Sequence, residues 1–161
     1  MGKPFQSTWI SATAFLLILL FVYTASSKLL AIKKFELVIA QSPLLADTAS
    51  VFSVAVPIIE LLIAILLVIP KWRFAGLLAS FFLLLAFSLY IAYMLLFASH
   101  LPCGCGGVIS GMSWSQHLLF NLFFWAITGI SIYFNSYAKL FIAINRGSRK
   151  PVETSRPISH S

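Results

Sequence analysis

The two cysteines of the chain, Cys103 and Cys105, lie one residue apart in the glycine-rich stretch HLPCGCGGVISGM, which runs from His100 to Met112. Thiols at this spacing can form a disulfide, because a permissive glycine between residues i and i+2 lets their Cα atoms approach to about 4.4–6.8 Å. Such a tight ring is expected to be strained, and strained, exposed disulfides tend to be redox-active. The pair therefore predicts a redox couple, with a structural disulfide or two packed free thiols as the alternatives.

Two histidines, His100 and His117, flank the cysteines and suggest a second kind of chemistry. Two thiolates and two imidazoles can bind zinc or copper(I). The spacing H-x2-C-x-C-x11-H matches no established metal motif, so we interpret both histidines as interfacial residues hydrogen-bonded at helix ends. Either could shuttle protons or stabilise a thiolate. A metal site made of Cys103, Cys105, His100 and His117 stays an alternative.

Glu60 is an acidic residue inside an apolar segment. It lies about nine residues, or roughly 13 Å, into that segment, where an unpaired charge costs at least about 2.5–3.5 kcal/mol. We expect its partner to be Lys28, at the outer end of the preceding apolar segment. The pair has two interpretations: an ion pair that holds two helices together, or a proton-relay or binding site. Pro57, one turn before Glu60, would leave a backbone carbonyl free.

The segments that must position these residues are long and apolar. Hydrophobic residues make up 60% of the chain and charged residues only 9%, which indicates an integral membrane protein. A bilayer core of roughly 30 Å needs about 20 apolar residues per helix. Four segments meet this length: residues 9–30, 51–69, 74–98 and 118–135. The first ends like a signal cleavage site, but its apolar run exceeds the roughly 7–15 residues of a signal peptide, so we expect a retained helix.

The predicted fold is all-α, an up-down bundle of four transmembrane helices in one domain, residues 1–145. After Lys28 the apolar positions keep a helical spacing until Ser42-Pro43, which predicts a short amphipathic helix at the membrane surface. The sequence PKWRF is long enough only for a tight turn between the second and third helices. Residues 146–161, with two prolines, several serines and no apolar pattern, are predicted to form a basic, disordered cytoplasmic tail.

The positions of the charges predict the orientation of the bundle. Of the 11 Lys and Arg residues, only Lys28, Lys33 and Lys34 lie in the first loop region and none lies in the third; the others belong to the N-terminus, the second loop and the tail. The positive-inside rule therefore places both termini in the cytoplasm and the loop that holds both cysteines, here the CGC loop, outside. An oxidising exterior favours disulfide chemistry. The basic residues are expected to meet lipid headgroups, and we expect no nucleic-acid partner.

This orientation gathers further polar residues in the outer half of the membrane. Tyr90 and Tyr93 lie near the outer end of the third helix, and Asn121 and Trp125 near the start of the fourth. Their clustering with the cysteines and Glu60 suggests one site. An aromatic belt at the interface explains the tyrosines and Trp125 equally well.

Several of these motifs occur together in a known family. The sequence has a first helix ending in S-S-K, then F-x-x-x-I-x-x-S-P-L-L, a second helix with P-x-x-E-L-L at Pro57 to Leu62, and C-G-C-G-G from Cys103 to Gly107. Over residues 10 to 135 it resembles the MauE branch of the DoxX-like membrane proteins. The resemblance implies a four-helix bacterial inner-membrane protein with a redox or maturation role, beside a thioredoxin-like periplasmic partner. Many relatives have C-x-C-F-G where this chain has Gly106-Gly107, so the resemblance does not specify a substrate.

Three functions are consistent with these observations. The first is a redox-accessory protein, and hence a thiol-disulfide oxidoreductase, whose Cys103–Cys105 pair exchanges disulfides with a periplasmic partner or client, with a quinone as a conjectured electron acceptor. The second is a non-catalytic subunit of a membrane complex, in which the CGC loop is a structural clip and Lys28–Glu60 an internal ion pair. The third is a transporter or metal-handling protein that uses Glu60 and the CGC loop.

Overall fold

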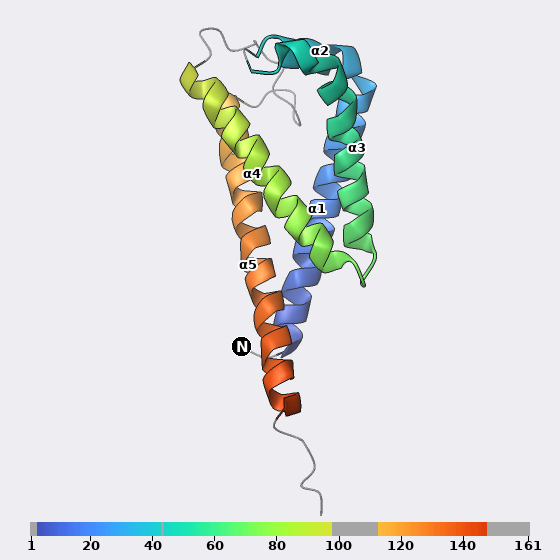
Figure 1. Ribbon diagram of the computed structural model, residues 1–161, viewed down its shortest axis with the longest axis vertical. Helices are drawn as coiled ribbons and strands as arrows, with labels where there is room; N and C mark the ends of the chain where they lie inside the picture. The colour runs from blue at the N-terminus through green and yellow to red at the C-terminus, as the bar shows by residue number, and fades with distance from the viewer. Residues whose placement is uncertain (1–2, 43, 98–112, 148–161) are drawn as a thin grey trace, which may run out of the picture.

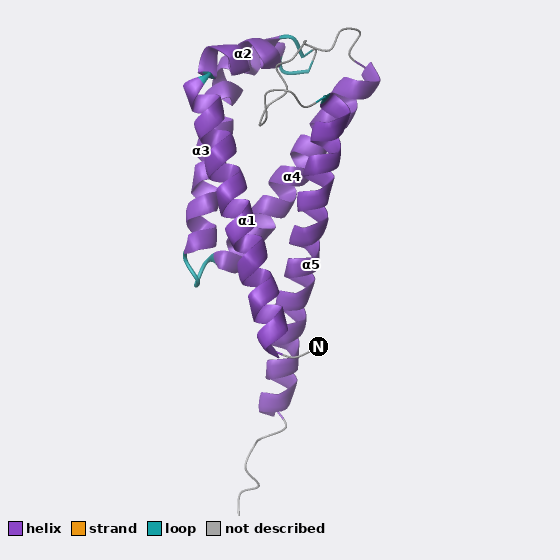
Figure 2. Cartoon of the chain, turned by 180° about the vertical axis from the view of Figure 1, so that it is seen from behind, coloured by secondary structure: helices purple, strands orange, loops and turns teal. Residues whose placement is uncertain are grey.

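The computed structural model describes residues 3–42, 44–97 and 113–147, and within these residues it is a bundle of helices (Figure 1). The long helices are α1 (Lys3–Leu30), α3 (Ala49–Val68), α4 (Arg73–Phe97) and α5 (Trp114–Gly147). The short α2 (Ile32–Ala40) and a 3-10 turn, Ala46–Thr48, connect α1 to α3. The described part of the chain contains no strand (Figure 2). Each long helix forms all or most of a stretch of 22 to 25 residues that is long and apolar enough to cross a membrane. The chain is therefore a multi-pass, all-α membrane protein, as predicted.

The four long helices alternate in direction, and each packs on its neighbours. α1 lies along α3, and α4 lies along α5, while α2 lies across one end of the bundle (Figures 1 and 2). We call the end covered by α2 the cavity end, because the cavity described below lies there. At the opposite end, here the turn end, the tight turn of residues 69–72 joins α3 to α4. α3 and α4 meet at the turn end and diverge toward the cavity end (Figure 1). The CGC loop joins α4 to α5, both of which reach the cavity end.

Two helix limits differ from the sequence prediction by more than about four residues. α1 begins at Lys3 instead of residue 9, because Pro4 is compatible with a first helical turn. α5 continues to Gly147 instead of ending at residue 135, since the sequence has no proline or glycine between residue 135 and Gly147. Two residues expected in the tail, 146 and 147, are therefore helical. The predicted disordered segment 148–161 lies outside the described residues.

The amphipathic helix after α1 is present as α2. Ala31, with φ of −115° and ψ of 36°, interrupts the helical backbone and separates α2 from α1. Val38 and Ile39 are buried on one face of α2, while Lys33 and Lys34 are exposed. The helix thus covers the cavity end of the bundle with its apolar face.

The apolar core fills the part of the bundle where the helices are closest. Leu17 and Phe21 of α1 pack there with Leu67 of α3 and Leu77 of α4. Gly76 makes this packing possible, because a Cβ atom at this position would lie 3.0 Å from the backbone nitrogen of Leu67. Small residues allow membrane helices to approach closely in this way. The closest approach of α3 and α4 is therefore fixed at the turn end.

Candidate functional site

A buried ion pair joins α1 to α3 near the cavity end. Lys28, in the last turn of α1, donates a hydrogen bond from Nζ to Oε1 of Glu60, near the middle of α3. The exposed fractions of the two side chains are only 11% and 2%. The Lys28 ammonium also lies 5.7 Å from the ring centre of Phe35 and 5.3 Å from that of Phe87, both within the range of cation–π attraction. The expected partner of Glu60 is thus the observed one.

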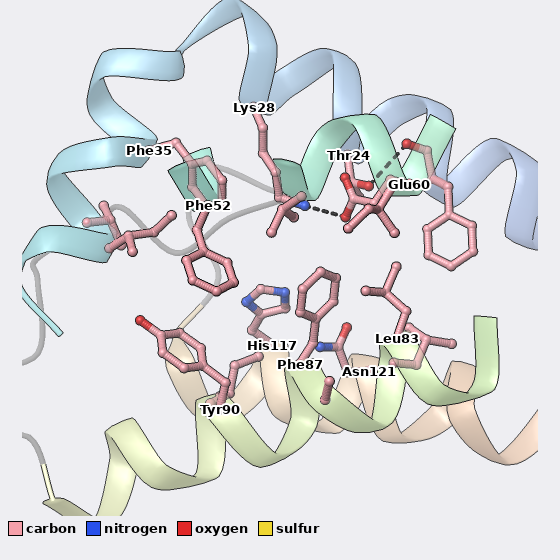
Figure 3. Close-up of a pocket in the computed structure, with 18 of the residues that line it drawn as sticks. Thr24, Lys28, Phe35, Phe52, Glu60, Leu83, Phe87, Tyr90, His117 and Asn121 are labelled. Atoms are coloured by element: carbon pink, nitrogen blue, oxygen red, sulfur yellow. Dashed lines mark hydrogen bonds and ion pairs between the residues drawn. The ribbon is translucent and has the colours of Figure 1, made fainter. Parts of the chain in front are cut away.

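The ion pair faces a cavity of about 330 Å³. One wall consists of α1, α2 and α3, and the other consists of α4 and α5 (Figure 3). Most of the lining side chains are apolar or aromatic. The polar side chains of the lining are those of Thr24, Lys28, Glu60, Tyr90, His117 and Asn121. Cavities of this kind, largely apolar with a few convergent polar groups, are typical of small-molecule sites.

Four polar atoms of the lining are buried without a hydrogen-bond partner among the described residues. They are Glu60 Oε2, Tyr90 Oη, His117 Nδ1 and Asn121 Nδ2. Leaving such an atom unsatisfied costs about 1–3 kcal/mol, and native proteins contain few of them. Their concentration on one cavity indicates that a water molecule or a ligand completes their hydrogen bonds.

The first turn of α5 is fixed by a capping arrangement that directs two residues into the cavity. The backbone nitrogen of Ser113 donates to Gln116 Oε1 at 2.9 Å, and the Gln116 nitrogen donates to Ser113 Oγ at 3.3 Å. This reciprocal pair is a capping box. It sets the start of the helix, so that Trp114 and His117 line the cavity. His117 and Asn121 then face the Lys28–Glu60 pair from the opposite wall (Figure 3).

The structure brings together only some of the polar residues that the sequence singled out. Tyr90, His117 and Asn121 share the cavity with Lys28 and Glu60. Two aromatic residues expected near them are not in its lining. Tyr93 instead packs on Phe97, with ring centres 5.1 Å apart, and Trp125 stacks on Phe81 at 5.0 Å.

The CGC loop is not placed by the structure. The predicted redox pair, Cys103 and Cys105, and His100 of the alternative metal site lie outside the described residues. Within the described residues no group of three or more His, Cys, Asp or Glu side chains could hold a metal ion.

Several aromatic residues and one threonine of the cavity lining were not predicted from the sequence. Thr24, Phe52, Phe87 and Trp114 line the cavity but were not singled out. A signal for Phe87 and Trp114 was available in helical spacing. Leu83, Phe87 and Tyr90 share one face of α4, and Trp114, His117 and Asn121 share one face of α5.

Comparison with known proteins agrees with this architecture. The family model described as methylamine utilisation protein MauE matches residues 6–134. Comparisons with curated proteins and with solved structures gave no match. The family match includes both residues of the ion pair and nearly all of the four membrane-spanning stretches. It confirms the resemblance seen in the sequence, and the chain belongs to the MauE family of membrane proteins.

Proposed function

We propose that this MauE-family protein is a redox-accessory protein of the bacterial inner membrane, which exchanges disulfides with a periplasmic partner through Cys103 and Cys105. The observation that carries the proposal is the position of the cysteines in the chain. They lie in the connection between α4 and α5, the helices that contribute Tyr90 and His117 to the cavity. Cys103 follows Phe97 by six residues, a reach of at most about 20–22 Å.

The exchange reaction is a pair of thiol substitutions. A thiolate of the partner attacks one sulfur of the Cys103–Cys105 disulfide, whose S–S bond breaks to give a mixed disulfide and a free cysteine thiolate. A second partner thiolate then attacks the partner sulfur of that mixed disulfide. The products are an oxidised partner and a reduced cysteine pair, so two electrons and two protons have moved to this protein. The same steps in reverse reduce a disulfide of the partner.

The distribution of basic residues supports a periplasmic CGC loop. Lys71 and Arg73 lie at the turn end of the bundle, which is also the end where α1 begins. The positive-inside rule assigns this end to the cytoplasm. The cavity end, from which the CGC loop extends, then faces the oxidising periplasm, where a thioredoxin-like protein or a maturing client is the partner we expect.

Trapping a mixed disulfide tests the proposal directly. Cells carrying a tagged Cys103→Ser or Cys105→Ser variant are quenched with acid, treated with a thiol-blocking reagent and analysed on non-reducing gels. We expect one of the single variants to form an adduct that a reductant dissolves, and mass spectrometry to identify the attached protein. The double serine variant is the control and should form none. Absence of an adduct from both single variants, with thiols that stay reduced in wild-type cells, would exclude disulfide exchange.

A non-catalytic subunit is the second candidate, and the Lys28–Glu60 contact favours it. An ion pair buried between two helices can serve the fold alone. On this reading the double serine variant keeps its function, and a substitution on the outer surface releases a co-purified protein. Copper or zinc that co-purifies with the wild type and is lost from the double serine variant would instead support metal handling.

A further inference from the structure

The cavity holds two nearly fully buried polar residues whose hydrogen bonds are incomplete. The exposed fraction is 1% for Glu60 and 5% for Asn121, and each has a polar atom without a partner among the described residues. They approach the cavity from opposite walls, Glu60 from α3 and Asn121 from α5 (Figure 3). An occupant that bonds to both must therefore carry hydrogen-bonding groups inside an otherwise apolar space.

The charge of the cavity favours a neutral occupant. Lys28 is neutralised by Glu60, and among the described residues that line the cavity there is no other Lys, Arg, Asp or Glu side chain. A carboxylate or a quaternary amine would enter this space without a free countercharge, which is costly in an apolar medium. A fatty acid or a cationic lipid is therefore a poor match, whereas a neutral molecule that dissolves in the bilayer is a good one.

The unpaired atoms specify both donors and acceptors for that occupant. Asn121 Nδ2 is a donor, Tyr90 Oη is both a donor and an acceptor, and Glu60 Oε2 is an acceptor when the carboxylate is ionised. A carbonyl oxygen can accept from Asn121 or Tyr90, and a hydroxyl can donate to Glu60. Rings also line the space, including those of Phe52, Phe87 and Trp114. A planar ring that carries carbonyl groups in one state and hydroxyl groups in the other satisfies all of these features.

We propose that this cavity binds the head group of a lipid-soluble quinone. A volume of about 330 Å³ is at the lower end of the range of roughly 300–1,000 Å³ for small-molecule sites, so it suits the ring while the apolar tail remains in the lipid. Tyr90 and Asn121 donate to the quinone carbonyls, and Glu60 accepts from a quinol hydroxyl. The binding site consists of described residues and does not depend on the thiols.

The use of the bound quinone rests on the proposed function. A reduced Cys103 and Cys105 pair would lose two electrons and two protons to form the disulfide, and the quinone would gain them to become the quinol. Quinone would then be the acceptor that regenerates the oxidised cysteine pair after each exchange.

Quinone binding can be measured with the full chain in lipid nanodiscs. A benzoquinone with a decyl tail is the probe, and quinone retained by protein-loaded discs above that retained by empty discs gives the Kd. We expect saturable binding of one quinone per chain. Decylbenzene, which has the ring and tail without carbonyls, should not compete for the site.

Matched variants locate the site. Tyr90→Phe removes one hydroxyl and should raise the Kd about fivefold, and Asn121→Leu should raise it about tenfold. Tyr93→Phe and Asn135→Leu change the same residue types outside the lining of the cavity and should leave the Kd unchanged. Thermal unfolding of each variant shows whether a weaker affinity reflects a misfolded chain. Tyr90→Phe keeps the aromatic ring, so of the two cavity variants it should disturb the fold least.

The outcomes separate this inference from the proposed exchange reaction. Saturable binding that weakens in Tyr90→Phe and persists when both cysteines are serine supports the quinone site. No excess binding, equal competition by decylbenzene, or equal affinity in all four variants overturns it. A trapped mixed disulfide without quinone binding leaves the exchange reaction standing and this inference wrong. Quinone binding without any mixed disulfide supports the quinone site and counts against the exchange reaction.

Discussion

Lys28 of α1 and Glu60 of α3 form an ion pair beside the cavity, at the end of the bundle where α3 and α4 diverge. Both charges are largely buried, since the exposed fractions of the side chains are 11% and 2%. Each charge is therefore stabilised mainly by the other and by the aromatic rings around the ammonium.

Breaking this pair from one side should destabilise the protein strongly. Lys28→Met leaves Glu60 charged and buried without its partner, so we expect a loss of about 3–5 kcal/mol of unfolding free energy. The double variant Lys28→Met/Glu60→Gln removes both charges and should recover most of that loss. Unfolding of the purified protein in detergent, followed by circular dichroism, measures both effects.

The surface pair Lys33–Glu36 is the matched control. Its charged atoms lie 3.4 Å apart and 90% of the Lys33 side chain is exposed, so Lys33→Met should cost no more than about 1 kcal/mol. Equal losses for Lys28→Met and Lys33→Met would show that the buried pair contributes nothing particular to stability.

Adding a methyl group at Gly76 should disturb the turn end. The new Cβ would lie 3.0 Å from the Leu67 nitrogen and from Leu67 Cγ, so α3 and α4 must separate, at a cost of about 1–3 kcal/mol. Gly129→Ala is the comparison, because its Cβ would meet Phe81 at 3.4 Å, close to ordinary contact. In detergent, Gly76→Ala should unfold at a clearly lower temperature than Gly129→Ala. The opposite order would refute the close approach of α3 and α4 at Gly76.

A hydrogen bond between α1 and α5 should contribute a smaller amount. Ser131 Oγ and Thr13 Oγ1 lie 2.9 Å apart, and both residues are buried. Ser131→Ala should cost about 0.5–2 kcal/mol, the range measured for hydrogen bonds between membrane helices. Ser88→Ala removes a hydroxyl that, among the described residues, bonds only to the Leu84 carbonyl of its own helix, so it should cost less. If the two variants unfold at the same temperature, the contact between helices adds no stability.

Thiol labelling in intact cells tests the orientation. A membrane-impermeant maleimide should modify Cys105 in a Cys103→Ser background, because the CGC loop is expected to face the periplasm. A cysteine introduced at Lys71, in a chain without the native cysteines, should react only after the cells are opened. Labelling of the Lys71 position alone in intact cells would mean that the bundle has the opposite orientation.

Much of the fold follows from simple length and charge rules. The four apolar segments are long enough to cross a bilayer, and each corresponds to an observed long helix. The partner of Glu60 was also predictable, since a charge inside the membrane needs an opposite charge within reach and Lys28 was the nearest. These predictions succeed because the bilayer penalises unsatisfied charge and unsatisfied backbone so heavily.

The cavity itself was not predictable from the apolar pattern. Leu84 is buried and Leu89 is exposed on the same helix, yet both are leucine, because lipid and protein core are equally apolar. Hydropathy therefore does not show which way a membrane helix faces. Tyr90 and Tyr93 illustrate the consequence: they are three residues apart, and only Tyr90 lines the cavity. The placement of Gly76 against Leu67 depends in the same way on tertiary packing.

The contact between Gly76 and Leu67 holds α3 and α4 together at one end only. The two helices join at the turn of residues 69–72 and open toward α2 (Figure 1). Because α4 is roughly 37 Å long, a small difference in the angle between α3 and α4 at this turn gives a large difference in their separation at the far end. The width of the space between Glu60 of α3 and Tyr90 of α4 therefore depends on the angle that the two helices form near Gly76 and Leu67.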